Sequence, residues 1–247
     1  MIETLPHFKE AEALRKTDPA QALELFQRLW EVTKQFRAAR GYAYCLRKAG
    51  RVEDAIAICH AALELYPTNK IIRNELAWAL YEIKIKPAKE NGDLRSILAA
   101  AKEIFGLEPD PMAQQKVAIK VIQVAKANGR WNVVLEWTNR FKPDDFSSES
   151  FPSYGKKLMS DREIFYNAKS RALYETKGFS ESRTFAQAGL AEYPDDIFLA
   201  RTAALALAEE GQVETAAEEL RQLIMNSTLS ISKTRNHRFS RHSCKLD

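Results

Sequence analysis

Basic and aromatic side chains recur together along the first 200 residues of the sequence, with a few amides among them. Arginine can pair with a carboxylate through two parallel hydrogen bonds, and tyrosine or tryptophan can stack on an aromatic ligand group. Such a set predicts a binding surface for an acidic or aromatic peptide, or for a single strand of nucleic acid. The candidate residues are Arg37, Arg40, Tyr44, Arg47, Asn74, Trp78, Tyr81, Lys116, Lys120, Gln123, Asn167, Arg171, Tyr174 and Arg201. The alternative, a charged face whose aromatic rings pack between neighbouring helices, stays open.

Residues suited to catalysis or metal binding are scarce. The sequence has no phosphate-binding glycine loop, no dinucleotide fingerprint, no HExxH and no GxSxG. His237, His242 and Cys244 are close together, but their spacing matches no standard zinc finger. We therefore predict a protein that is not an enzyme and that binds no metal or cofactor.

Composition narrows the class of protein. The chain has 247 residues, a net charge of +4 and only nine glycines and nine prolines, too few for the many turns of an all-β fold. The charge is mild compared with that of dedicated nucleic-acid-binding domains. An odd number of cysteines, three, fits a reduced compartment better than a disulfide scaffold. With no apolar leader and no apolar run of about 18 residues, we expect a cytoplasmic protein with no membrane span.

The stretch 41–67 contains the signals of two packed helices. The first helix is expected to end near Lys48, with Gly50 just beyond it, where positive φ is common. The second is expected to begin after Glu53 and Asp54 and to stop before Pro67. Alanines at positions 43 and 55 would let the two helices approach closely.

The landmarks of this stretch recur. Leu76, Ala77 and Leu80 follow Tyr42, Ala43 and Leu46 by 34 residues, whereas Gly92 follows Gly50 by 42, which places eight extra residues in 81–93. Gly178 follows Gly129 by 49 residues, and this surplus of 15 falls in 141–161. Upstream, Asp18 and Pro19 are typical of a helix start. We expect both surplus segments to be loops.

The 34-residue pattern resembles the tetratricopeptide repeat, a helix–turn–helix unit. The resemblance implies an all-α, α-α superhelix over residues 5–225, with the candidate residues on its concave face, and leaves 226–247 as a disordered basic tail. It also implies a non-enzymatic scaffold or adaptor that binds a protein or peptide, preferentially an acidic one. Glu75 would repel a carboxylate at a family clamp position, so we do not expect a chaperone-tail clamp.

A narrower resemblance implies an alternative function. Residues 77–87, 133–151 and 158–179 look like tetratricopeptide-like proteins of bacterial conflict (defence) systems, in which a cold-shock-like barrel often follows the repeats. No barrel follows residue 226, so this alternative implies a truncated member. In that case nucleic acid would associate through a partner or through the basic tail.

Overall fold

The computed structural model describes residues 4–149 and 159–225, and every regular element in them is helical. The predicted all-α class is confirmed. The tail 226–247 and the middle of the second surplus segment lie outside the described residues. The chain divides into two compact units, residues 1–128 and 129–247. The prediction of a single repeat domain over 5–225 stays a prediction.

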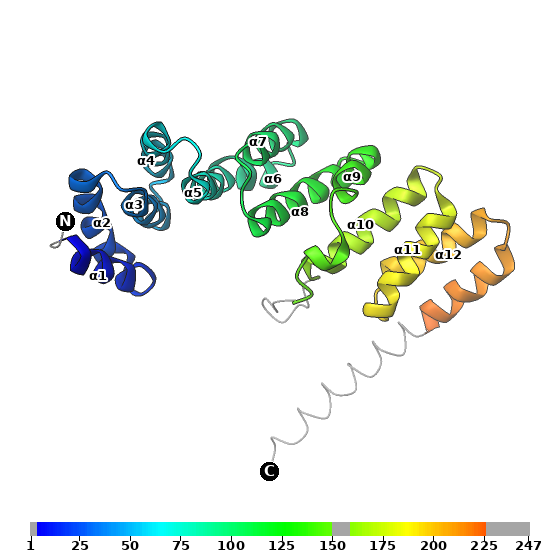
Figure 1. Ribbon diagram of the computed structural model, residues 1–247. Helices are drawn as coiled ribbons and strands as arrows, with labels where there is room; N and C mark the ends of the chain where they lie inside the picture. The colour runs from blue at the N-terminus through cyan, green and yellow to red at the C-terminus, as the bar shows by residue number, and fades with distance from the viewer. Residues whose placement is uncertain (1–3, 150–158, 226–247) are drawn as a thin grey trace, which may run out of the picture. The chain divides into compact units, whose positions relative to one another are not determined.

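The first unit consists of helices joined by short turns. Neighbours along the chain pack against each other, and first helices of successive pairs also touch, α1 with α3 and α3 with α5 (Figure 1). The elements are α1 (Thr4–Thr17), α2 (Pro19–Thr33), α3 (Phe36–Lys48), α4 (Val52–Leu65), α5 (Lys70–Leu80), the π-helical η1 (Tyr81–Ile85), α6 (Lys86–Glu90), α7 (Leu94–Gly106) and α8 (Pro111–Ala127).

Local sequence signals set these helix ends much as predicted. Helix α3 ends at Lys48, and Gly50 has a φ of +79°. Asp18 caps α2, since its carboxylate accepts a 3.1 Å hydrogen bond from the N–H of Gln21. Ala43 and Ala55 are 0% and 1% exposed, in agreement with a close contact between α3 and α4.

The first surplus segment is helical, so the predicted loop there is wrong. Helix α5 continues through η1 into α6, which lengthens the first helix of the pair. Tyr81, Ile85 and Ala88 are buried at helical spacing, and their burial favours continuing the helix over forming a loop. The π turn ends at Ile85, two residues before Pro87, which has no N–H for a regular α-helical bond.

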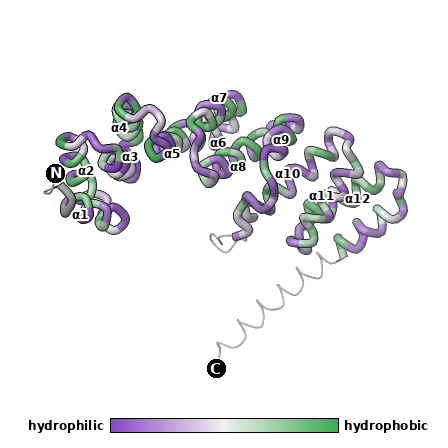
Figure 2. The backbone as a smooth tube through the Cα atoms, in the orientation of Figure 1, coloured by the Kyte–Doolittle hydropathy of each residue, from purple (hydrophilic) through white to green (hydrophobic). Residues whose placement is uncertain are grey.

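The second unit contains further helix pairs. Its elements are α9 (Trp131–Thr138), the 3₁₀ turn η2 (Pro143–Asp145), α10 (Asp161–Glu175), α11 (Phe179–Glu192), α12 (Ile197–Glu209) and a helix over 213–225. A core of Tyr166, Ala186, Leu199 and Ala203 joins α10, α11 and α12. Hydrophobic and hydrophilic residues follow one another along the helices of both units, as amphipathic packing requires (Figure 2).

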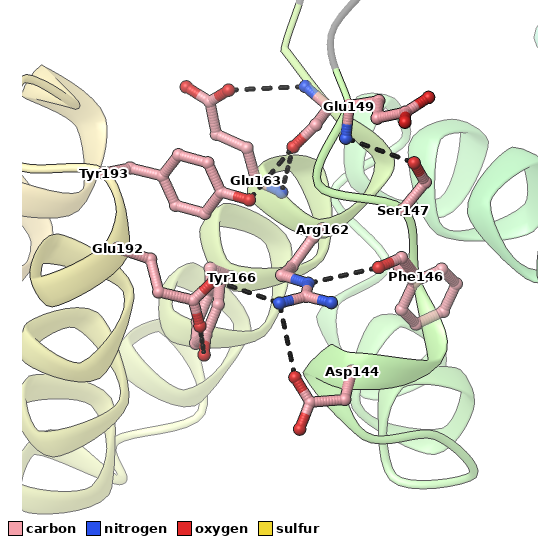
Figure 3. Close-up of polar contacts among 10 residues, drawn as sticks. Asp144, Phe146, Ser147, Glu149, Arg162, Glu163, Tyr166, Glu192 and Tyr193 are labelled. Atoms are coloured by element: carbon pink, nitrogen blue, oxygen red, sulfur yellow. Dashed lines mark hydrogen bonds and ion pairs between the residues drawn. The ribbon is translucent and has the colours of Figure 1, made fainter.

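The second surplus segment is irregular where it is described, and its start is fastened to α10. Phe146 is 2% exposed, and its ring centroid lies 4.8 Å from that of Phe165. The guanidinium of Arg162 donates a 3.1 Å hydrogen bond to the carbonyl of Phe146, and pairs with Asp144 and Glu192 at 3.3 Å each (Figure 3).

The end of the same segment is fastened to α11. The hydroxyls of Ser160 and Tyr193 are 3.2 Å apart, so they share a hydrogen bond. Ser160 also caps α10, where its side chain accepts from the N–H of Glu163. Both ends of the segment are thus held against the same helix pair.

Candidate functional site, a pocket in the first unit

A pocket of about 680 Å³ opens in the first unit, a volume typical of ligand clefts. Helices α1, α3 and α5 and the connection from α7 to α8 form its walls. Five of the predicted site residues line it, namely Arg40, Tyr44, Arg47, Asn74 and Trp78. The others that line it are Arg15, Lys70, Ile71, Glu75, Glu108, Pro109 and Asp110.

Aromatic rings and guanidinium groups stack on one side of the pocket. The guanidinium carbons of Arg15 and Arg47 lie 4.9 Å and 5.5 Å from the ring centroid of Tyr44. Such stacking fixes the ring and leaves it half-buried. Trp78 is also half-buried, and its ring centroid lies 5.8 Å from that of Tyr81 in a T-shaped contact; Tyr81 itself is 8% exposed. Tyr81 is therefore a buried residue against which Trp78 packs.

Arg47 forms its ion pairs with carboxylates of the protein itself. Its Nε donates a 3.1 Å hydrogen bond to Glu75, and its Nη1 lies 3.7 Å from Glu82. The side chains of Arg47 and Glu75 are only 10% and 8% exposed. A buried guanidinium needs such partners because it has lost its hydration. Arg47 and Glu75 thus form the floor of the pocket as an ion pair.

Asn74 positions the opposite wall. Its amide nitrogen donates to the carboxylate of Asp110 at 2.7 Å, and its amide oxygen accepts from the N–H of Asp110 at 3.1 Å. The same carboxylate caps α8 through the N–H of Ala113 at 2.8 Å. Asn74 therefore fastens the α7–α8 connection to α5.

Two cations of the pocket are uncommitted. Neither Arg40, which is half-buried, nor Lys70, which is exposed, has a hydrogen bond or ion pair with any residue the structure describes. Sequence reasoning missed Lys70, although it lies one turn before Asn74 on the same helix face. It also missed Arg15, because the sequence analysis identified only the second helix of the opening pair.

The remaining candidates of the first unit do not line this pocket. Arg37 is exposed, and its guanidinium lies 5.9 Å from the ring centroid of Phe36. Lys116, Lys120 and Gln123 are half-buried on α8. The side-chain oxygen of Gln123 is buried without a hydrogen-bond partner among the described residues.

Four candidates belong to the second unit and have their own contacts there. Asn167 is 4% exposed and donates to Asp196, which places it in the core of that unit. Arg171 pairs with Glu175 and stacks on Tyr174 at 5.0 Å, and Arg201 is exposed. A single concave face shared with the first unit stays a prediction.

A metal site and a membrane-spanning helix would each place requirements on the described residues. No group of three potential metal ligands is found there, and no helix there is long and apolar enough to cross a bilayer. The histidines and the cysteine of the tail lie outside the described residues. Burial raises the pKa of Cys45 to about 11 and that of Cys59 to about 12, so these thiols are poor nucleophiles.

Comparison with known proteins points to one family. Residues 13–68 match the family model described as the tetratricopeptide repeat. No curated protein matches the sequence. None of the comparisons supports the narrower resemblance to conflict-system proteins.

Two solved structures show the fold. One is YrrB, described as a TPR protein with an unusual peptide-binding site, at 16% identity and a TM-score of 0.50 over 90% of this chain and 98% of that one. The other is the C-terminal part of a TPR repeat-containing protein from Cytophaga hutchinsonii, at 12% identity and a TM-score of 0.51 over 89% of this chain and 80% of that one. The tetratricopeptide repeat model matches residues 13–68, and the helix-pair fold of the described residues agrees with these two structures.

Proposed function

We propose that this protein is a non-enzymatic adaptor that binds an acidic segment of a protein or peptide in the pocket of its first unit. The observation that carries the proposal is the pair of uncommitted cations, Arg40 and Lys70, beside the half-buried rings of Tyr44 and Trp78. YrrB, which has the same fold, is described as having a peptide-binding site, and this is consistent with the class of ligand.

The two cations suit an acidic ligand for complementary reasons. A guanidinium offers a planar pair of donors to a carboxylate, while an ammonium acts as a point charge on a flexible stem. Arg47 is neutralised by Glu75 and contributes no free charge. The aromatic rings add apolar area at a low entropic cost. The expected ligand is therefore a short acidic segment with at least one apolar or aromatic side chain.

The proposal is tested by reversing charge in the pocket of the full-length chain. A fluorescent peptide of alternating aspartate and phenylalanine serves as the probe, and its affinity is measured by fluorescence polarisation. Arg40→Glu combined with Lys70→Glu should weaken binding at least about tenfold, because two attractive contacts become repulsive. The loss should shrink at high salt, where screening has already weakened the wild-type contact.

The matched control reverses two charges elsewhere in the same unit. Lys89→Glu with Lys102→Glu makes the same change in net charge, and both lysines are exposed and outside the described pockets. Lys48 would be a poor control, because its ammonium lies 5.7 Å from the ring centroid of Tyr44. Equal losses in the two double variants would indicate diffuse electrostatics and overturn the proposal.

Nucleic acid is the competing ligand in this experiment. Glu108 and Asp110 line one wall of the pocket, and their charge opposes a phosphate backbone that would span it. An unlabelled single-stranded oligonucleotide should therefore fail to displace the peptide at physiological salt. Displacement with a steep dependence on salt would contradict the peptide assignment.

We also propose a cytoplasmic location, because the free thiols Cys45 and Cys59 favour a reducing compartment.

A further inference from the structure

We infer that the segment bound in this pocket is bipolar, with an acidic residue against Arg40 and a basic residue against Glu108. The inference rests on the proposed function and adds to it the charge pattern of the ligand. It follows from how the charged residues are distributed over the walls of the pocket.

Charge changes sign from one wall of the pocket to the other. Arg15 and Arg40 come from α1 and α3, whereas Glu108 and Asp110 come from the connection between α7 and α8. Helix α5 lies between these walls, because it contacts α3 on one side and α7 and α8 on the other. A ligand that spans the pocket therefore meets cations at one end and carboxylates at the other.

Glu108 is the available acid of the second wall. Its side chain is 75% exposed, and the one ion pair it forms among the described residues is with Arg73 at 3.7 Å. The guanidinium of Arg73 is also held by two hydrogen bonds to the carbonyl of Pro67. Asp110, in contrast, already accepts from Asn74 and from the first turn of α8. Glu108 is thus the carboxylate whose other oxygen, Oε1, is available to a basic ligand side chain.

Helix α5 also offers apolar surface between the two walls. Ile71 of α5 is 43% exposed and lines the pocket beside Trp78. Burial of an apolar ligand side chain there would add to the affinity through the hydrophobic effect. The complementary ligand therefore has an acidic residue, an apolar or aromatic residue, and a basic residue in that spatial order.

The backbone conformation at Glu108 allows a variant that tests its binding role separately from its effect on stability. Its φ is +52°, in the left-handed region where glycine is preferred after a helix end. Glu108→Gly removes the carboxylate and also removes the conformational cost of a side chain at that φ. The variant should therefore lose the contact with the basic residue without becoming less stable.

The experiment compares two peptide probes on the full-length chain. One probe, acetylated and amidated, has two aspartates, a central phenylalanine and two lysines, and the other has glutamines in place of the lysines. Each is made in both chain orders, and the tighter order is used. Affinities are measured by fluorescence polarisation for the wild type, Glu108→Gln and Glu108→Gly. Glu90→Gln is the matched control, because Glu90 is exposed in the same unit and outside the described pockets.

The ratio of the two affinities is the decisive quantity. Changing Glu108 to Gln or Gly should shift this ratio about two- to five-fold against the lysine probe, the range for an exposed ion pair, and Glu90→Gln should leave it unchanged. The melting temperature of Glu108→Gly should equal or exceed that of the wild type. An unchanged ratio in Glu108→Gln, or a melting temperature that falls in Glu108→Gly, overturns the inference.

The outcomes also separate this inference from the proposed function. Reversing the charges of Arg40 and Lys70 could weaken binding of both probes while substitutions of Glu108 leave the ratio of their affinities unchanged. In that case the pocket binds acidic segments and the bipolar pattern is wrong. If neither probe binds the wild type, or if reversing Arg40 and Lys70 has no effect, the proposed function fails and this inference fails with it.

Discussion

Gly41 allows α2 and α3 to touch, and replacing it with alanine measures how tightly they are packed. A Cβ at this position would lie 2.3 Å from the ring of Phe26, far inside van der Waals contact. Phe26 is 0% exposed, so its ring has no solvent into which it can move. Overpacking of this kind costs about 1–3 kcal/mol. Alanine regains about 1 kcal/mol over glycine within a helix.

The net effect of Gly41→Ala should be a loss of about 2 kcal/mol, because the close contact is with a rigid buried ring and favours the upper end of the packing cost. For a chain of this size, that corresponds to a fall in melting temperature of about 4–8 °C. Two other glycines calibrate the result. At Gly189 the nearest atom is Leu199 Cδ1 at 2.8 Å, so we expect a loss of about 0–1 kcal/mol there.

Gly106 provides the opposite limit. It ends α7, and a Cβ there would meet nothing within 4 Å, so Gly106→Ala should be neutral or stabilise by up to about 1 kcal/mol. Urea denaturation and thermal melting give the three free energies of unfolding. Because repeat arrays can unfold in parts, hydrogen exchange of the α2 and α3 amides should locate the loss caused by Gly41→Ala.

A double variant shows whether Phe26 is the cause. Phe26→Leu makes room for the new methyl group, so the pair with Gly41→Ala should lose less stability than the sum of the single losses, by about 0.5–3 kcal/mol. If the two losses simply add, the contact with the ring is not responsible. If Gly41→Ala is as stable as Gly106→Ala, the packing of α2 on α3 described above is wrong.

Three further predictions concern thiols, helix packing and the second surplus segment. In a Cys244→Ser background, Cys45 and Cys59 should resist a thiol reagent at pH 8 until urea unfolds the chain. Unfolded thiols ionise near 9.0 while the native ones keep their protons, so the free energy of unfolding should fall as pH rises from about 9 to 11. Ala55→Leu should cost about 1–3 kcal/mol in urea denaturation, and a neutral result would mean that the α3–α4 contact is misplaced. Arg162→Leu should speed hydrogen exchange in the described start of the second surplus segment but not in α12, since it removes one hydrogen bond and two ion pairs.

Helix ends were predictable because their signals are local. A cap such as Asp18 bonds a backbone group three residues away, and the positive φ of Gly50 reflects its own missing side chain. Each of these effects operates within one turn of helix, so a window of a few residues contains the whole cause. The same holds for the small residues Ala43 and Ala55, whose spacing already placed them at a helix contact.

The conformation of the first surplus segment was harder to predict from landmarks. Counting from glycine to glycine gives the number of extra residues in 81–93 but not their structure. Pro87 and the Asn91–Gly92 pair favour a loop, whereas Tyr81, Ile85 and Ala88 repeat at helical spacing and are buried. The helix persists because burial of that stripe outweighs one proline, and the π turn removes the conflict with its missing N–H.

The pocket of the first unit was only partly predictable because the partners of its side chains are distant in sequence. Repeat alignment assigns a residue to the first helix of a pair and to one face of it. It does not show that Arg47 pairs with Glu75, 28 residues away, or that Asn74 pairs with Asp110, 36 residues away. Those contacts depend on how successive helix pairs stack, which no short window of sequence contains.

Pairing within the protein distinguishes the cations that line the pocket. Arg47 lies at the floor of the pocket, where loss of hydration makes an unpaired guanidinium too costly, and it has two carboxylate partners. Lys70 is exposed and Arg40 is half-buried, and neither has a carboxylate partner among the described residues. A cation that already has carboxylate partners acts as a structural element, whereas one without them is available to a ligand. If the proposed function is right, Arg40 and Lys70, and not Arg47, should therefore determine the affinity of the pocket for an acidic segment.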